Sequence, residues 1–216
     1  MCFETFPNGY TYLDKIDLQH NKKQFWLVNG ISFLLLALML VAGYFIDNIT
    51  QIEESAELFI AIAVLIVGYV LYIVLHEATH GLVMRLSVKA KLNFGFKGWA
   101  AYAGSTGYFD KNHYIAIALA PLILWGIVFG ILNFFFRSGM WFWVIWILQT
   151  GNVSGAAGDL FCTYKMFRYP KDILVRDSGT EMLIFRRQTE DELAAESDKK
   201  QKDEVQAEIR GDLTDD

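Results

Sequence analysis

The residues best suited to chemistry are His76-Glu77-Ala78-Thr79-His80, an H-E-x-x-H motif. Positions i and i+4 of a helix share one face, so two imidazoles placed in this way can bind one Zn²⁺ at about 2.0–2.1 Å. Glu77 follows His76 by one residue, about 100° further around the helix, where it would flank the metal instead of binding it. A glutamate placed there can act as the general base for a metal-bound water. The motif therefore predicts a zinc site with hydrolytic chemistry.

A third zinc ligand must come from another part of the chain, and we expect it to be Asp159. Measured from the start of their apolar blocks, His76 lies about 27 Å and Asp159 about 28 Å along two helices that run in the same direction. The alternative is that Asp159 forms an ion pair with Lys165 or Arg168 near the membrane surface. The other candidates lie at a different depth or in segments that would have to fold back towards the motif: Asp110, Asn152, Asp172, Asp177 and Glu181.

Four long apolar blocks would have to hold these side chains in place. The first is uncharged over 22 residues, a helix of about 33 Å that is long enough for a hydrocarbon core of about 30 Å. The second ends in the motif, and ionisable residues in such a span are costly and usually functional. We expect Pro121 to kink the third block. The blocks cover residues 25–46, 58–86, 114–136 and 140–166.

Two shorter segments have the signals of β-hairpins. Leu92, Phe94 and Phe96 alternate with more polar residues, which is a strand pattern, and a glycine-containing run follows up to Phe109. Residues 173–185 could form a second hairpin that turns at Asp177-Ser178-Gly179. The expected fold class is an all-α membrane protein with four transmembrane helices and a small cytoplasmic β-hairpin element.

Charge divides the chain and orients it. Residues 188–216 hold eleven acidic and four basic residues, so we expect residues 1–187 to form the membrane domain and 188–216 an acidic cytoplasmic tail, disordered or a solvated helix. Lysine and arginine are absent from residues 47–57 but frequent before the first block, in 85–113 and after the fourth. The positive-inside rule then predicts a multi-pass protein of the cell membrane with both termini cytoplasmic. The sequence lacks the clustered basic face that a nucleic-acid-binding protein would have, so we expect no nucleic-acid partner.

At these residues the chain resembles the zincin peptidase family of bacterial membrane proteins, which is related to the site-2 protease group of intramembrane zinc metallopeptidases. The matching elements are His76–Gly81, the small-residue segment Gly155–Leu160 and the glycine-containing strand Phe94–Lys97. The resemblance covers roughly residues 15–187. It implies that His76, His80 and Asp159 bind Zn²⁺ and that Glu77 is the catalytic base.

One departure from the site-2 protease pattern concerns the segment around the predicted third ligand. Those proteins place their ligand Asp in an Asn-Pro-Asp-Gly setting, whereas Gly158-Asp159-Leu160 lacks both the proline and the following glycine. We therefore expect the bend of that motif to be missing.

The sequence thus predicts a membrane-embedded zinc metallopeptidase that hydrolyses membrane or membrane-proximal proteins or peptides near the cytoplasmic face, with the lipid bilayer as its surroundings. One alternative is a non-catalytic membrane scaffold that keeps a structural zinc. Another is a metal sensor or transporter that uses the same His and Asp residues.

Overall fold

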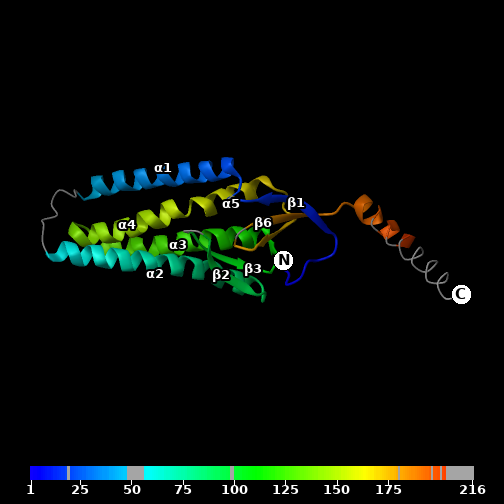
Figure 1. Ribbon diagram of the computed structural model, residues 1–216, viewed down its shortest axis with the longest axis horizontal. Helices are drawn as coiled ribbons and strands as arrows, with labels where there is room; N and C mark the ends of the chain where they lie inside the picture. The colour runs from blue at the N-terminus through cyan, green and yellow to red at the C-terminus, as the bar shows by residue number, and fades with distance from the viewer. Residues whose placement is uncertain are drawn as a thin grey trace.

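The computed structural model has a bundle of helices with the strands gathered at one end (Figure 1). The N-terminus lies at the strand end (Figure 1), and the first strand pairs there with the last one. The structure describes residues 1–18, 20–47, 56–97, 100–179, 181–195, 197–199 and 201–202.

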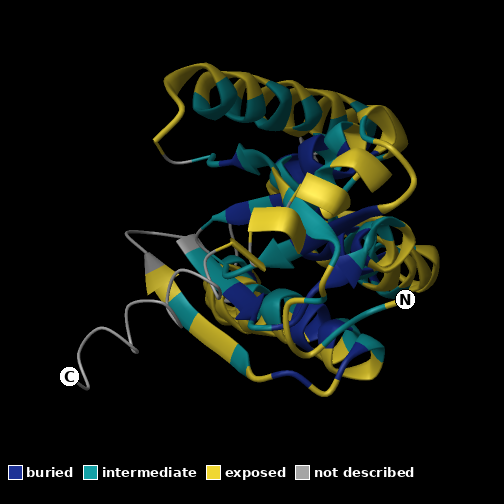
Figure 2. Cartoon of the chain, turned by 90° about the vertical axis from the view of Figure 1, so that its right-hand side faces the viewer, coloured by how far each residue is buried: buried dark blue, intermediate teal, exposed yellow. Residues whose placement is uncertain are grey.

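Long helices occupy all four predicted apolar blocks. They are α1 (Lys22–Ile46), α2 (Ala56–Ser87), α3 (Lys111–Phe135), α4 (Gly139–Gly155) and α5 (Ala157–Arg168). Within the described residues, α1, α2 and α3 are the helices long and apolar enough to cross a membrane. Many of their large apolar side chains are exposed (Figure 2), which suits contact with lipid and not with water.

The fourth apolar block differs from the single helix that we expected. It is divided at Ala156 into α4 and α5, because this residue leaves the helical conformation within a run of small residues. With 17 residues, α4 is about 26 Å long and Asp159 lies in the first turn of α5. The helix is thus interrupted three residues before Asp159 although the proline and the following glycine are missing, and a fourth membrane span stays a prediction.

The structure is mostly helical, as expected, but its strands form two sheets and so exceed the single small hairpin element of the expected fold class. Both predicted hairpins are present, but the second also pairs with a strand that the sequence analysis did not predict, at residues 10–16. The larger sheet has the antiparallel order β1 (Tyr10–Ile16), β6 (Met182–Arg187), β5 (Ile173–Asp177) and β4 (Phe109–Asp110). The smaller sheet pairs β2 (Leu92–Lys97) with β3 (Ala100–Ser105).

A well-packed core joins the larger sheet to the strand-side ends of the helices. Ile16 of β1, Met84 of α2, Ile117 of α3, Met166 of α5 and Ile184 of β6 are all buried in it. Met84 follows His80 by one turn of α2, so the motif borders this core.

Two glycines bring neighbouring elements into close contact. A Cβ on Gly104 of β3 would overlap the backbone of Ser178 in the turn between β5 and β6, so the two hairpins meet there. A Cβ on Gly151 of α4 would lie 2.5 Å from the Tyr69 ring of α2, so this glycine does allow a close helix approach. Gly155 has no neighbour of this kind and faces the cavity described below.

The described beginning of the tail is a capped helix. The Thr189 backbone N–H donates to the Glu192 carboxylate at 2.9 Å, and the Glu192 N–H donates to the Thr189 hydroxyl at 3.4 Å. Arg186 of β6 also forms an ion pair with Glu192 at 2.5 Å. Residues 203–216 and most of the predicted outer loop, 48–55, lie outside the described residues, so the proposed division of the chain at residue 188 stays a prediction.

Candidate metal centre

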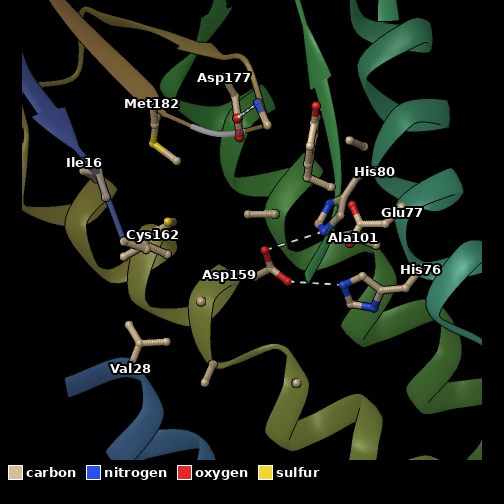
Figure 3. A pocket seen from close by; sticks show the side chains of 18 of the residues that line it. Ile16, Val28, His76, Glu77, His80, Ala101, Asp159, Cys162, Asp177 and Met182 are labelled. Atoms are coloured by element: carbon tan, nitrogen blue, oxygen red, sulfur yellow. Dashed lines mark hydrogen bonds and ion pairs between the residues drawn. The ribbon is translucent and has the colours of Figure 1, made fainter. Parts of the chain in front are cut away.

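The two motif histidines and Asp159 point towards one another (Figure 3). The Nε2 atom of His76 lies 3.4 Å from Oδ2 of Asp159, and Nε2 of His80 lies 3.6 Å from Oδ1. His76 and His80 come from successive turns of α2, while Asp159 comes from the first turn of α5. One metal-ligating atom from each of the three residues lies within 4.8 Å of the other two.

The spacing and chemistry of this donor set fit a zinc ion. Ligands held at about 2.0–2.2 Å in tetrahedral geometry are separated from one another by about 3.3 Å. The 3.4 and 3.6 Å separations are close to that value. Two imidazoles and a carboxylate are common zinc ligands, and three protein ligands leave the fourth position for a water.

The outward-facing ring nitrogens of both histidines are already bound, which fixes their tautomers. Nδ1 of His80 is 2.9 Å from the carbonyl oxygen of Ile117, which can only accept, so Nδ1 carries the hydrogen. Nδ1 of His76 lies 2.9 Å from the Tyr72 hydroxyl, which donates its own hydrogen to Oδ1 of Asn152 at 3.0 Å. In both rings, Nε2 therefore keeps a lone pair for a metal.

Glu77 lies beside the three candidate ligands without joining them. Its side chain lines the same cavity (Figure 3), next to Ala103 of β3. Glu77 is therefore placed to act on a group held in this cavity and is not one of the three candidate ligands.

The site opens into a cavity of about 510 Å³. Its walls come from α1, α2, α3, β3, α5 and the turn between β5 and β6, with Asn29, Tyr102, Asp177 and Glu181 among the polar residues. The expectation that Asp177 and Glu181 lie away from the motif is wrong, because the second hairpin folds back over the site. Neither residue is among the three that could share the metal ion.

The remaining acidic candidates have other places in the fold. Asp110 caps α3, and Asp172 lines a separate cavity near the N-terminus. The alternative ion pairs of Asp159 do not appear among the described contacts: Lys165 lies over the ring of Tyr169, and Arg168 binds the hydroxyl of Tyr164.

A second cluster, Cys2, Asp110 and His113, also brings three possible ligand atoms within 4.8 Å of one another. Its geometry is that of a helix cap, because Asp110 accepts the backbone N–H groups of Asn112 and His113 at 3.0 Å each. The His113 ring and the N-terminal ammonium group also contact the Asp110 carboxylate. The cap accounts for these contacts without a metal.

Sequence reasoning did not find the groups that orient the histidines. Tyr72 precedes His76 by one helical turn, a spacing that could have marked it as a neighbour. Ile117 acts through its backbone carbonyl, which leaves no signal in the residue type.

The comparison with known families agrees with this geometry. Residues 69–174 match the model of a family described as "Putative zincin peptidase". This part of the chain is similar to that family. The matched range contains His76, Glu77, His80 and Asp159, and the family description points to a zinc peptidase, with zinc as the metal.

A relative from Pyrococcus woesei is similar in sequence, but its name gives no activity. The chain is 32% identical over 125 residues to an uncharacterized 24.7 kDa protein in the gap 5′ region of Pyrococcus woesei. The match covers 55% of this chain and 53% of the relative, so the chain spans about half the length of the curated relative it matches. No solved structure matches the chain.

Proposed function

We propose that the protein is a membrane-embedded zinc endopeptidase that hydrolyses membrane or membrane-proximal proteins near the cytoplasmic face. The observation that carries the proposal is the convergence of Nε2 of His76 and Nε2 of His80 on the Asp159 carboxylate, with Glu77 on the wall of the same cavity. The zincin-like match supports the same chemistry.

His76, His80 and Asp159 would hold the zinc ion. Bound there, zinc supplies Lewis acidity that polarises a peptide carbonyl and lowers the pKa of a water towards about 7. Glu77 would accept the proton of that water and then deliver it to the departing amine. Its side chain lines the cavity beside Ala103 of β3.

The free edge of β3 is suited to hold an extended substrate. Within the described residues, β3 pairs only with β2, and Ala101, Tyr102 and Ala103 line the cavity next to Glu77. A peptide in extended conformation could add to this edge by backbone hydrogen bonds, as in β-augmentation. A transmembrane substrate would have to unwind locally first, because the backbone groups of a helix are already paired.

The depth of the site supports cleavage at the cytoplasmic side. The strands lie at the end of the bundle where α2 ends and α3 begins (Figure 1), and that connecting segment is rich in lysine and arginine. We propose that α4 and α5 together complete a fourth span and that both termini are cytoplasmic.

The deciding experiment compares cells that express the wild-type protein with cells that express Glu77→Gln. The glutamine keeps the shape of the side chain but cannot accept the water proton, so proteolysis should fall by a factor of about 10² or more. Quantitative proteomics of the membranes should then reveal proteins that accumulate only with the variant.

Zinc analysis of the purified proteins provides the control. Both should contain one zinc ion per chain, because Glu77 is not a ligand. A Glu77→Gln protein that retains both zinc and full function would contradict the peptidase proposal and favour the scaffold. Zinc flux into proteoliposomes, equal for both proteins, would instead favour a transporter.

A further inference from the structure

The contact between His80 and Ile117 depends on a backbone group that a regular helix would not leave free. In an α-helix the carbonyl of residue i accepts the N–H of residue i+4. For Ile117 that position is Pro121, which lies inside α3 and has no N–H. Pro121 and Ile117 are both buried, so leaving the Ile117 carbonyl oxygen without another hydrogen-bond donor would cost free energy.

The donor is the metal-site histidine. Nδ1 of His80 lies 2.9 Å from the Ile117 carbonyl oxygen and is its side-chain partner across the interface of α2 and α3. The proline ring also crowds the carbonyl of residue i−4 and turns it away from the helix axis. Both effects of the proline make this oxygen available to α2.

The same helix supports the second histidine by a longer route. Asn152 of α4, fully buried, donates from Nδ2 to the carbonyl of Leu122, the residue after Pro121, at 3.2 Å. Its Oδ1 accepts the Tyr72 hydroxyl, which in turn accepts Nδ1–H of His76. Thus α3 donates no ligand, yet its backbone around Pro121 sets the orientation of both imidazoles.

We propose that Pro121 is a positioning residue of the metal site. By removing the N–H that would pair with Ile117, it reserves that carbonyl for His80 and keeps His80 in the tautomer that presents the lone pair of Nε2. In the other tautomer, Nε2 would carry the hydrogen and could not bind zinc. The inference rests on the proposed metal role of His80 but not on peptide hydrolysis.

The test is Pro121→Ala in the full-length protein, purified in detergent. The new N–H of residue 121 competes for the Ile117 carbonyl, so zinc affinity, measured by competition with a chelator, should fall about tenfold or more, as for other groups that orient zinc-bound histidines. Thermal unfolding of the zinc-free variant should occur at the same or a higher temperature than in the wild type, because alanine suits a helix interior better than proline.

A second readout reports the hydrogen bond directly. In ¹⁵N-histidine NMR spectra of the zinc-loaded proteins, the Nδ1–H of His80 should exchange slowly with water in the wild type and faster in Pro121→Ala. Pro170→Ala is the matched control, since Pro170 is exposed and follows α5, and it should change neither measurement.

Two results would overturn the inference. One is a Pro121→Ala protein with wild-type zinc affinity and wild-type exchange of the His80 Nδ1–H. The other is weaker zinc binding together with earlier unfolding of the zinc-free protein, which would assign Pro121 a purely structural role. A protein that binds zinc as expected but cleaves nothing would refute the proposed function and leave this inference intact.

Discussion

Gly104 of β3 and Ser178 in the turn between β5 and β6 touch backbone to backbone, with no room for a side chain at position 104. This contact fixes the β2–β3 hairpin, and with it the β3 edge beside Glu77, against the larger sheet. The geometry of the proposed substrate edge therefore depends on a glycine that is not one of the candidate metal ligands.

Gly104→Ala should separate the two hairpins, because the neighbouring atoms belong to the backbone and cannot rotate away. We expect the protein to lose about 1–3 kcal/mol of stability, the usual cost of overpacking. Denaturant unfolding in detergent would measure this loss. Gly130→Ala, at a position in open space inside α3, should be at least as stable as the wild type, because alanine suits a helix interior better than glycine; equal behaviour of the two variants would argue against the contact.

Asp159→Ala should weaken zinc binding by more than about 100-fold, since loss of a ligand should cost at least as much as loss of a group that orients one. The matched control is Asp177→Asn, an acid that lines the same cavity but lies outside the group of possible ligands. Its zinc affinity should change by less than about tenfold. Chelator competition would measure both, and the reverse order would make Asp177 the third ligand.

The cap of α3 should make stability depend on pH. Burial alone would raise the pKa of Asp110, but the backbone N–H of His113, the N-terminal ammonium and the His113 ring bind its carboxylate and hold the pKa well below its usual range. The unfolded carboxyl, with a pKa of about 3.9, takes up its proton first as the pH falls. The stabilisation is therefore complete above about pH 4 and is lost as the pH drops below that value.

A comparison with Asp110→Asn isolates this effect from zinc loss, which is common to both proteins. The wild type should unfold at a higher temperature than the variant at pH 7, and the difference should close below about pH 4. A difference that is constant from pH 7 to pH 3 would show that the Asp110 charge does not stabilise the cap.

The topology can be tested with single cysteines at Glu53 and Lys97 in a protein without Cys2 and Cys162. A membrane-impermeant maleimide applied to intact cells should label position 53 and miss position 97, because the base-free loop is expected outside and the base-rich segment inside. After permeabilisation, both should be labelled. Labelling of position 97 in intact cells would contradict the four-span arrangement.

Helices and hairpins could be predicted because their signals are local. Apolar length marks α1, α2 and α3, and the turn at Asp177-Ser178-Gly179 marks the second hairpin, where Gly179 has φ of +85°. Strand β1 was missed because its residues 10–16 lack a regular alternation and gain their pairing from β6, far along the chain. The division at Ala156 was missed because small residues permit a break without requiring one.

At the site, side chains could be predicted and backbone partners could not. The motif spacing led to His76 and His80, and an acid at matching depth led to Asp159, although their roles as ligands stay predictions. The carbonyl of Ile117 has no signature in its own residue type. Its only trace in the sequence is Pro121, four residues later, which was interpreted as a kink.

The pairing of β1 with β6 has a consequence for biosynthesis. Ile16 at the end of β1 and Met182 at the start of β6 both line the cavity, and their strands pair from Tyr10 with Arg187 to Ile16 with Met182. A ribosome makes the H-E-x-x-H helix and then Asp159 well before β6 emerges. The growing chain therefore carries its candidate metal ligands in a cavity that lacks a wall, and synthesis through Arg187 is needed to close it.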